Sequence, residues 1–198
     1  MGKRLGTLTL LVIATSLTAC GSKGGNSSAV ATDNMAADNL NMADNNAAME
    51  TPPAAAPMSG QDFANAAAGS DAFEIASSKL ALDKAQSADV KKFAQQMIDA
   101  HTESTAKLKK AASTASPAVT PDPTLSPDLQ SKLDALKPQS GAAFDQAYIN
   151  DQITAHETTL AALQSYAVAG DVPPLKSFAT EMVPIVSGHL DMARGLKP

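Results

Sequence analysis

Long alanine-rich segments separated by sharp stops occupy the chain after Pro57, and they limit what it can fold into. Alanine has the highest intrinsic helix propensity, whereas aromatic residues, which favour strands, make up only 4% of the chain. Helices that are joined by short turns pack as antiparallel neighbours. The sequence therefore predicts an all-α protein whose helices form a bundle.

Turn and capping residues divide this region into four long helices and one short one. Ser87 is expected to cap the second long helix, and Gly170 to end the third. A proline-rich connection between the second and third long helices holds the short amphipathic helix, which begins at Ser126-Pro127 and is expected to cover one end of the core. The long helices are predicted at residues 61–85, 88–113, 141–169 and 173–195.

Three of the long helices carry an apolar seam with spacings of three and four residues, and each seam contains one of the three histidines, His101, His156 and His189. The clearest seam belongs to the last helix and consists of Leu175, Phe178, Met182, Ile185, His189, Met192 and Leu196. Side chains on such a seam face the core. All three imidazoles are therefore predicted to point into the bundle.

Distance along each helix places these groups at a similar height. His101 and His156 lie about fourteen residues from both ends of their helices, and Glu74 on the first helix lies at nearly the same level. Imidazole and carboxylate are common ligands of zinc, iron and copper. The sequence thus predicts a site for one transition-metal ion at His101, His156, His189 and Glu74.

A second interpretation explains the same residues without a metal. Buried polar groups also pair with one another, and such a network fixes the register of packed helices. This interpretation predicts that the histidines and Glu74 hydrogen-bond to one another and to Ser77, Ser104 or Tyr148. The protein would then be a structural or protein-interaction module of the cell envelope.

The first twenty residues predict export and lipid attachment. Lys3 and Arg4 precede a short apolar run at residues 8–13, and small residues lead to Cys20, the only cysteine. This order is typical of a lipoprotein signal peptide, here residues 1–19, and acylation of Cys20 would anchor the protein to a membrane. With Cys20 lipidated, no thiol remains for a disulfide or for catalysis.

A polar stretch and the overall charge complete the expected organisation. Residues 20–58 lack a sustained apolar period and are predicted to form a disordered tether, followed by the bundle domain at residues 59–198. Gly21 and Ser22 follow the cysteine without an aspartate, which by resemblance to bacterial lipoproteins predicts the outer membrane and a domain that faces the periplasm. The net charge of −5 and the absence of a basic arm argue against nucleic acid. No catalytic spacing of residues supports an enzyme.

The residues of the two hairpins also resemble a known family. The stretches 73–82 and 90–102 resemble the first hairpin of domain-of-unknown-function family 4142, and 140–148, 155–157 and 188–190 resemble its second half. The resemblance covers about residues 62–196. It implies a ferritin-like four-helix bundle, here with a short extra helix in the long crossover, and an envelope location, but no established reaction. We expect a broad role in envelope stress or homeostasis.

The histidines depart from the di-iron pattern of ferritin-like proteins. That pattern needs a carboxylate three residues before a histidine on two helices. Here the residues at that spacing are Ile98, Ile153 and Val186. A site for a single metal ion, or none, is therefore expected in place of a di-iron centre.

Overall fold

The computed structural model describes residues 58–198, within which it contains five helices. They are α1 (Gly60–Lys84), α2 (Ala88–Ser113), α3 (Pro127–Leu136), α4 (Gly141–Ala169) and α5 (Pro173–Gly195). The predicted all-α bundle is confirmed, and the long helices begin and end within one residue of the predicted positions. The predicted signal peptide, the lipid attachment at Cys20 and all but the last residue of the predicted tether lie outside the described residues.

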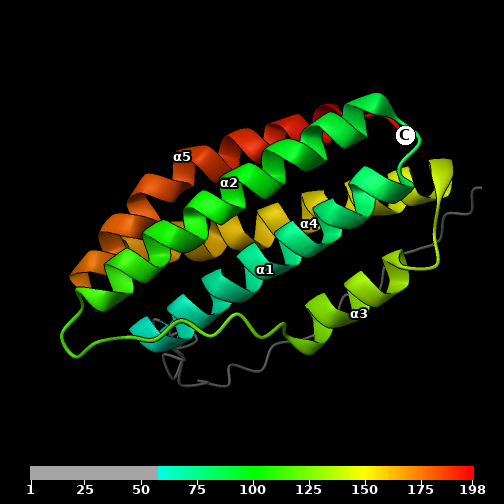
Figure 1. Cartoon of the computed structure of the whole chain (residues 1–198). Coiled ribbons are helices and arrows are strands. Elements are labelled where there is room, and N and C mark those ends of the chain that lie inside the picture. Colours follow the sequence, from blue (N-terminus) through cyan, green and yellow to red (C-terminus); the bar gives the residue numbers. More distant parts are fainter. Residues whose placement is uncertain (1–57) are drawn as a thin grey trace, which may run out of the picture. The chain divides into compact units, whose positions relative to one another are not determined.

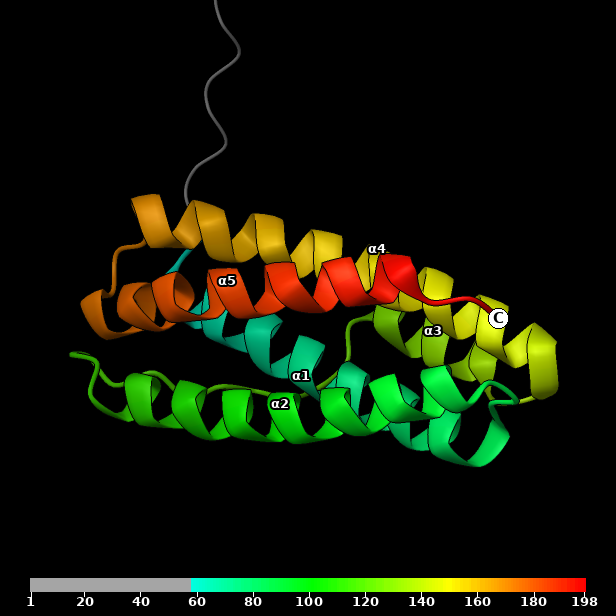
Figure 2. The ribbon, with the colours of Figure 1, turned by 90° about the horizontal axis from the view of Figure 1, so that it is seen from above.

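The four long helices form two hairpins that lie side by side. α1 packs against α2, and α4 packs against α5; α1 also contacts α4, and α2 contacts α5 (Figures 1 and 2). The crossover with α3 runs along the bundle, so that α4 begins beside the turn between α1 and α2. Neighbouring long helices are therefore antiparallel, and a single long crossover is the connection found in ferritin-like bundles.

Asp145 fixes the start of α4 to that turn. Its buried carboxylate accepts hydrogen bonds from the backbone N–H groups of Gln86, at 3.1 Å, and Ser87, at 2.8 Å. Ser87 occupies the N-cap position of α2 as predicted, but its side chain makes no capping hydrogen bond. Gly141 opens α4 with a φ of 62°, a left-handed conformation that favours glycine.

Gly170 follows α4 because of a close approach to Tyr166. Its φ is −60°, in the ordinary range, so its freedom to adopt a left-handed conformation is not used. A Cβ atom at this position would lie 2.5 Å from the carbonyl oxygen of Tyr166. The prediction that α4 ends at Gly170 is confirmed, and the reason is the space available against the preceding turn.

The short helix α3 covers a flank of the bundle, and the prediction that it covers an end is wrong. It lies along α1 and contacts α4 (Figure 1). Leu133 packs with Phe73 and Ala155, which lie near the middle of α1 and α4.

None of the five helices that the structure describes is both long enough and apolar enough to cross a bilayer.

The core contains two large apolar clusters with polar residues between them, and a small third cluster of Phe73, Leu133 and Ala155 beneath α3. One cluster surrounds Phe63, whose ring stacks on Tyr166 with centroids 3.9 Å apart. The other surrounds Phe144 and Tyr148, whose centroids are 5.9 Å apart. Between them lies a set of buried polar side chains that we call the polar layer: Asp71, Glu74, Ser77, His101, Ser104, Gln152 and His156.

The buried face of α5 differs from its predicted seam in the second half of the helix. Val186, Leu190 and Ala193 are buried there, whereas Met192, which was predicted to face the core, is 41% exposed. A strict alternation of three and four residues has a period of 3.5, but a straight α-helix has 3.6 residues per turn and drifts about 20° per heptad. The drift turns Met192 outward and leaves His189 at the edge of the buried face.

Candidate metal centre

The three predicted histidines lie together at mid-height, one each on α2, α4 and α5. The ring centroids of His101, His156 and His189 are 5.7 to 5.8 Å apart in all three pairs. Each ring offers one nitrogen that lies within 4.8 Å of a nitrogen of both other rings. His101 and His156 are buried, and His189 is half-buried. The predicted convergence of the imidazoles is confirmed.

Hydrogen bonds fix which nitrogen of two rings stays free. The Nδ1 atom of His156 lies 2.8 Å from the backbone carbonyl oxygen of Gln152, so it must donate a proton to that oxygen. The Nδ1 atom of His101 lies 2.8 Å from Oδ1 of Asp71 and donates to the carboxylate in the same way. In the neutral rings, the remaining Nε2 atoms therefore carry lone pairs.

Three ring nitrogens of this cluster are buried and have no hydrogen-bond partner: Nε2 of His101, Nε2 of His156 and Nδ1 of His189. A buried polar atom without a partner is destabilising, and such atoms are rare in folded proteins. Here one occurs in each of three rings that face one another. This arrangement fits a positively charged ion that would accept the three lone pairs.

Asp71 is a part of this site that the sequence analysis missed. It is 4% exposed, and its second oxygen accepts a hydrogen bond of 3.1 Å from Oγ1 of Thr105. Carboxylates that hold the far nitrogen of a ligating histidine are common around metal ions, where they fix the tautomer and orient the ring. The available signal was the spacing of Asp71 from Glu74, three residues away on the same face of α1.

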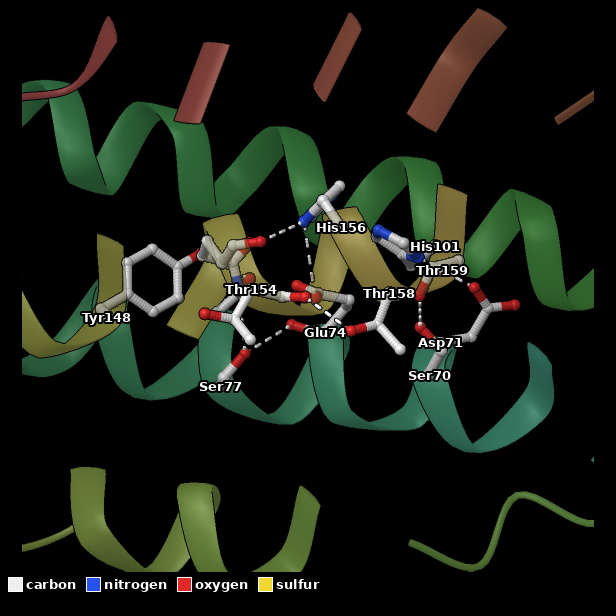
Figure 3. A network of polar contacts seen from close by, with 12 residues as sticks. Ser70, Asp71, Glu74, Ser77, His101, Tyr148, Thr154, His156, Thr158 and Thr159 are labelled. Atoms are coloured by element: carbon white, nitrogen blue, oxygen red, sulfur yellow. Dashed lines mark hydrogen bonds and ion pairs between the residues drawn. The ribbon is translucent and has the colours of Figure 1, made fainter. Parts of the chain in front are cut away.

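Glu74 lies beside the ring of His156, outside the group of three mutually close donor nitrogens. Its Oε1 atom is 3.7 Å from Nδ1 of His156, and neither carboxylate oxygen has a hydrogen-bond partner (Figure 3). Burial raises the pKa of Glu74 to about 7, against the charge of His101, which lowers it. Its role as a fourth ligand stays a prediction.

Burial and nearby charges shift the pKa values of the three histidines in different directions. Burial and the charge of His101 lower the pKa of His156 to about 3 and that of His189 to about 4, so both rings are neutral at pH 7. Burial also lowers the pKa of His101, but the hydrogen bond that its ring donates to Asp71 and the charges of Glu74 and Asp71 outweigh this effect and raise the pKa above its ordinary value. A proton on Nε2 of His101 therefore competes with a metal ion more strongly than a proton on an ordinary imidazole would.

The metal-free interpretation expects the histidines and Glu74 to pair with one another and with Ser77, Ser104 or Tyr148; the first kind of contact occurs between His156 and Glu74, whereas Ser77 and Tyr148 bond elsewhere. Tyr148 bonds to Ser78 at 2.7 Å, and Ser77 accepts a bond of 3.4 Å from Nε2 of Gln152. Ser104 is buried in the same layer. The histidines instead contact Asp71, Glu74 and the backbone of α4, which leaves the three ring nitrogens unpaired.

Comparison with known families now gives the chain its relatives. The model of DUF4142, described as a domain of unknown function, matches residues 45–196. The chain belongs to the DUF4142 family. No curated protein matches this DUF4142 chain.

The fold of the DUF4142 domain also resembles a solved structure, described as CopM in the Cu(II)-bound form. The two share 17% sequence identity with a TM-score of 0.58, over 70% of this chain and 95% of CopM. At this identity the likeness is one of fold. The resemblance stated from the sequence is thus confirmed for the family and for the helical architecture.

The distances between the histidine nitrogens of this chain can be compared with those expected around a coordinated ion. Zinc lies about 2.0–2.1 Å from imidazole nitrogens, so nitrogens on a tetrahedral ion are about 3.4 Å apart. The limit of 4.8 Å within this site exceeds that value. Side-chain movements of about 1 Å close the difference. The donor types and their burial fit a single ion, and the rings need only a small inward shift.

Proposed function

We propose that this protein binds a single transition-metal ion through His101, His156 and His189. The observation that carries the proposal is that each of the three rings has a nitrogen within 4.8 Å of a nitrogen of both other rings, and that each ring has a buried nitrogen without a hydrogen-bond partner. An ion that is held by three imidazoles in their neutral form, on separate helices, keeps a further coordination position for Glu74, water or another ligand. Among the described residues, this is the cluster that offers three histidine donors to one ion.

Copper is the first candidate ion, with zinc and iron as the others. Imidazole ligands suit all three metals. The fold likeness to CopM, whose structure is described as Cu(II)-bound, supports copper by analogy. Analogy of fold does not establish a ligand set, so the proposal for this chain depends on its own histidines.

The proposed setting is the cell envelope. The signal-like residues 1–19 and Cys20 support a lipid anchor, and Gly21 and Ser22 support sorting to the outer membrane with the domain facing the periplasm. A metal-binding domain in that compartment suits a role in envelope stress or metal homeostasis. Fractionation in the native host tests the location, and residence in the inner membrane would contradict it.

Metal analysis of the purified protein tests the binding proposal. Metal-free wild-type protein is reconstituted separately with Cu²⁺, Zn²⁺ and Fe²⁺, passed over a desalting column and analysed for bound metal. We expect one ion per chain in the wild type and loss of that ion in His156→Ala. Glu157→Ala is the matched control, because Glu157 is the next residue on α4 but is exposed and pairs with Arg194 on the surface.

A different result would favour the structural interpretation. If no stoichiometric metal remains on the wild type, and His156→Ala changes only the free energy of unfolding, the polar layer serves to fix helix register. The protein would then be an interaction or scaffold module of the envelope. The outer faces of the helices would then be the surfaces that bind a partner protein.

A further inference from the structure

Two buried carboxylates touch the outer edges of two of the three imidazoles. Asp71 and Glu74 are 4% and 1% exposed, and they contact the Nδ1 atoms of His101 and His156 at 2.8 and 3.7 Å (Figure 3). Both oxygens of Asp71 have hydrogen-bond partners, but neither oxygen of Glu74 does. Glu74 is therefore a buried acid without a hydrogen-bond donor, and the charge that compensates it must lie within the site.

The nearby lysines are already paired with other acids. Lys132 on α3 lies 2.8 Å from Asp151 on α4 and balances its charge. Lys107 on α2 bridges Glu103 and Glu181 at the surface between α2 and α5, at 2.9 and 2.8 Å. Because these two lysines pair with other acids, they do not compensate the charges of Asp71 and Glu74 in the polar layer.

A count of charges then distinguishes between ions. A bound cation favours the ionised form of both neighbouring carboxyl groups, so that with three neutral imidazoles as ligands Asp71 and Glu74 give the polar layer a charge of −2. A divalent ion brings the sum to zero, whereas a monovalent ion leaves one buried negative charge. Buried charge without compensation is strongly unfavourable.

We propose that Glu74 makes the site selective for a divalent ion over a monovalent ion of comparable coordination chemistry. This inference rests on the proposed function and adds the class of ion to it. Glu74 acts through charge at the Nδ1 edge of His156, and it does not need to touch the ion. Its interaction with the ion grows in proportion to the ionic charge.

Paired titrations of the full chain with Zn²⁺ and Ag⁺ test this inference. Both ions have filled d shells, so preferences of d electrons for a geometry do not enter the comparison. Affinities are measured by competition with chelators in wild type and in Glu74→Gln. We expect Glu74→Gln to weaken Zn²⁺ binding by about 10- to 100-fold.

The loss for Ag⁺ is expected to be at most half as large on a logarithmic scale. The ratio of Zn²⁺ to Ag⁺ affinity should therefore fall by about threefold or more. Glu157→Gln is the matched control, since it removes the same group from an exposed position next to His156. We expect it to leave the ratio unchanged.

Several results would overturn the inference alone. They are an unchanged affinity ratio in Glu74→Gln, an equal fall of the ratio in Glu157→Gln, or Zn²⁺ binding to the wild type while Ag⁺ binds neither form. If Glu74→Gln does not fold, Glu74→Met replaces it, because apolar substitution of a buried ionic group is often tolerated. Failure of both ions to bind the wild type would instead contradict the proposed function.

Discussion

At the end of the bundle near Phe63, side chains meet as apolar surfaces, whereas at mid-height they meet as imidazoles and carboxylates with unpaired atoms. The rings of Phe63 and Tyr166 stack on each other, Phe178 packs edge-on against Phe63, and the Tyr166 hydroxyl donates a hydrogen bond of 2.8 Å to Asp171. The polar layer leaves three ring nitrogens and both oxygens of Glu74 without hydrogen bonds. Apolar packing at the ends of the bundle stabilises the fold, whereas the unpaired polar atoms at mid-height lower its stability but form a site that can bind an ion.

The largest expected effect is at the apolar end. Phe63 is 1% exposed, so Phe63→Ala removes a buried ring and its stacking contact with Tyr166. We expect the free energy of unfolding in urea to fall by about 3–5 kcal/mol, with unchanged metal stoichiometry in the folded fraction. Val168→Ala is the control, since Val168 is 79% exposed and should change stability by no more than about 0.5 kcal/mol. Loss of metal from folded Phe63→Ala would show that the two regions are not independent.

Added metal should stabilise the middle of the bundle. At a Zn²⁺ concentration of about 100 times the Kd, binding to the folded state raises the free energy of unfolding by about 2.7 kcal/mol. His156→Ala should lose this gain, and a chelator should reverse it in the wild type. Thermal or urea unfolding with and without Zn²⁺ measures the difference. An equal gain in His156→Ala would mean that the ion binds elsewhere.

Tyr148 lies where the apolar cluster near Phe144 meets the polar layer. Its hydroxyl makes a buried hydrogen bond of 2.7 Å with Ser78, so Tyr148→Phe leaves Ser78 without that partner. We expect a loss of about 1–3 kcal/mol in urea unfolding. The double variant with Ser78→Ala should recover part of the loss, because no hydroxyl is then left unpaired. A double variant with summed losses would contradict this explanation.

Acid should destabilise the metal-free polar layer. His156 and His189, with pKa values lowered to about 3 and about 4, stay neutral in the folded state while the unfolded chain protonates them near pH 6.5. Each proton that is bound only on unfolding lowers stability by about 1.4 kcal/mol per pH unit as the pH falls.

Glu74 acts in the opposite direction. With its pKa raised to about 7, it is protonated in the folded state between pH 4.5 and 7 but ionised in the unfolded chain, and it offsets one of the two protons. Stability should therefore fall from pH 6.5 to 4.5 with the slope of about one proton, and more steeply below pH 4.5. Urea unfolding across this range measures the slope. His156→Ala should flatten it, and a slope that is unchanged in that variant would contradict the assignment.

The smallest effect is expected on the outer surface. Arg194 and Glu157 form an ion pair of 2.7 Å between α5 and α4, and both side chains are about half exposed. Exposed pairs contribute less than about 1 kcal/mol, so Arg194→Ala should change urea unfolding by no more than that amount, and less in high salt. A larger change would indicate that the pair has a role beyond the surface.

The helices and the meeting of the histidines could be predicted because both depend on spacing along the chain. Residues at equal distances from a tight turn reach equal heights on antiparallel helices, so His156 and His189 meet whatever lies around them. The rotation of a helix about its axis is less easily predicted, and a small error in the assumed period placed Met192 in the core. Contact of α3 with a flank also could not be predicted, because it depends on the path of the crossover.

The partners of each histidine were harder to predict than its position. Asp71 and Glu74 lie on the same face of α1, and only the packing of α1 between α2 and α4 decides which carboxylate contacts which ring. The result pairs Asp71 with His101 and Glu74 with His156. Three-dimensional packing thus decides the partners, and of the two carboxylates the sequence indicated Glu74 alone.

The mid-height position of the polar layer has a further electrostatic consequence. Favourable effects of the helix dipole act within the first and last turns of a helix, and neighbouring antiparallel dipoles oppose one another. His101 lies three turns or more from both ends of α2, so backbone dipoles offer little to a cation there. Side chains must therefore supply the counter-charge. The number of buried carboxylates then determines how much positive charge can be bound stably inside the bundle.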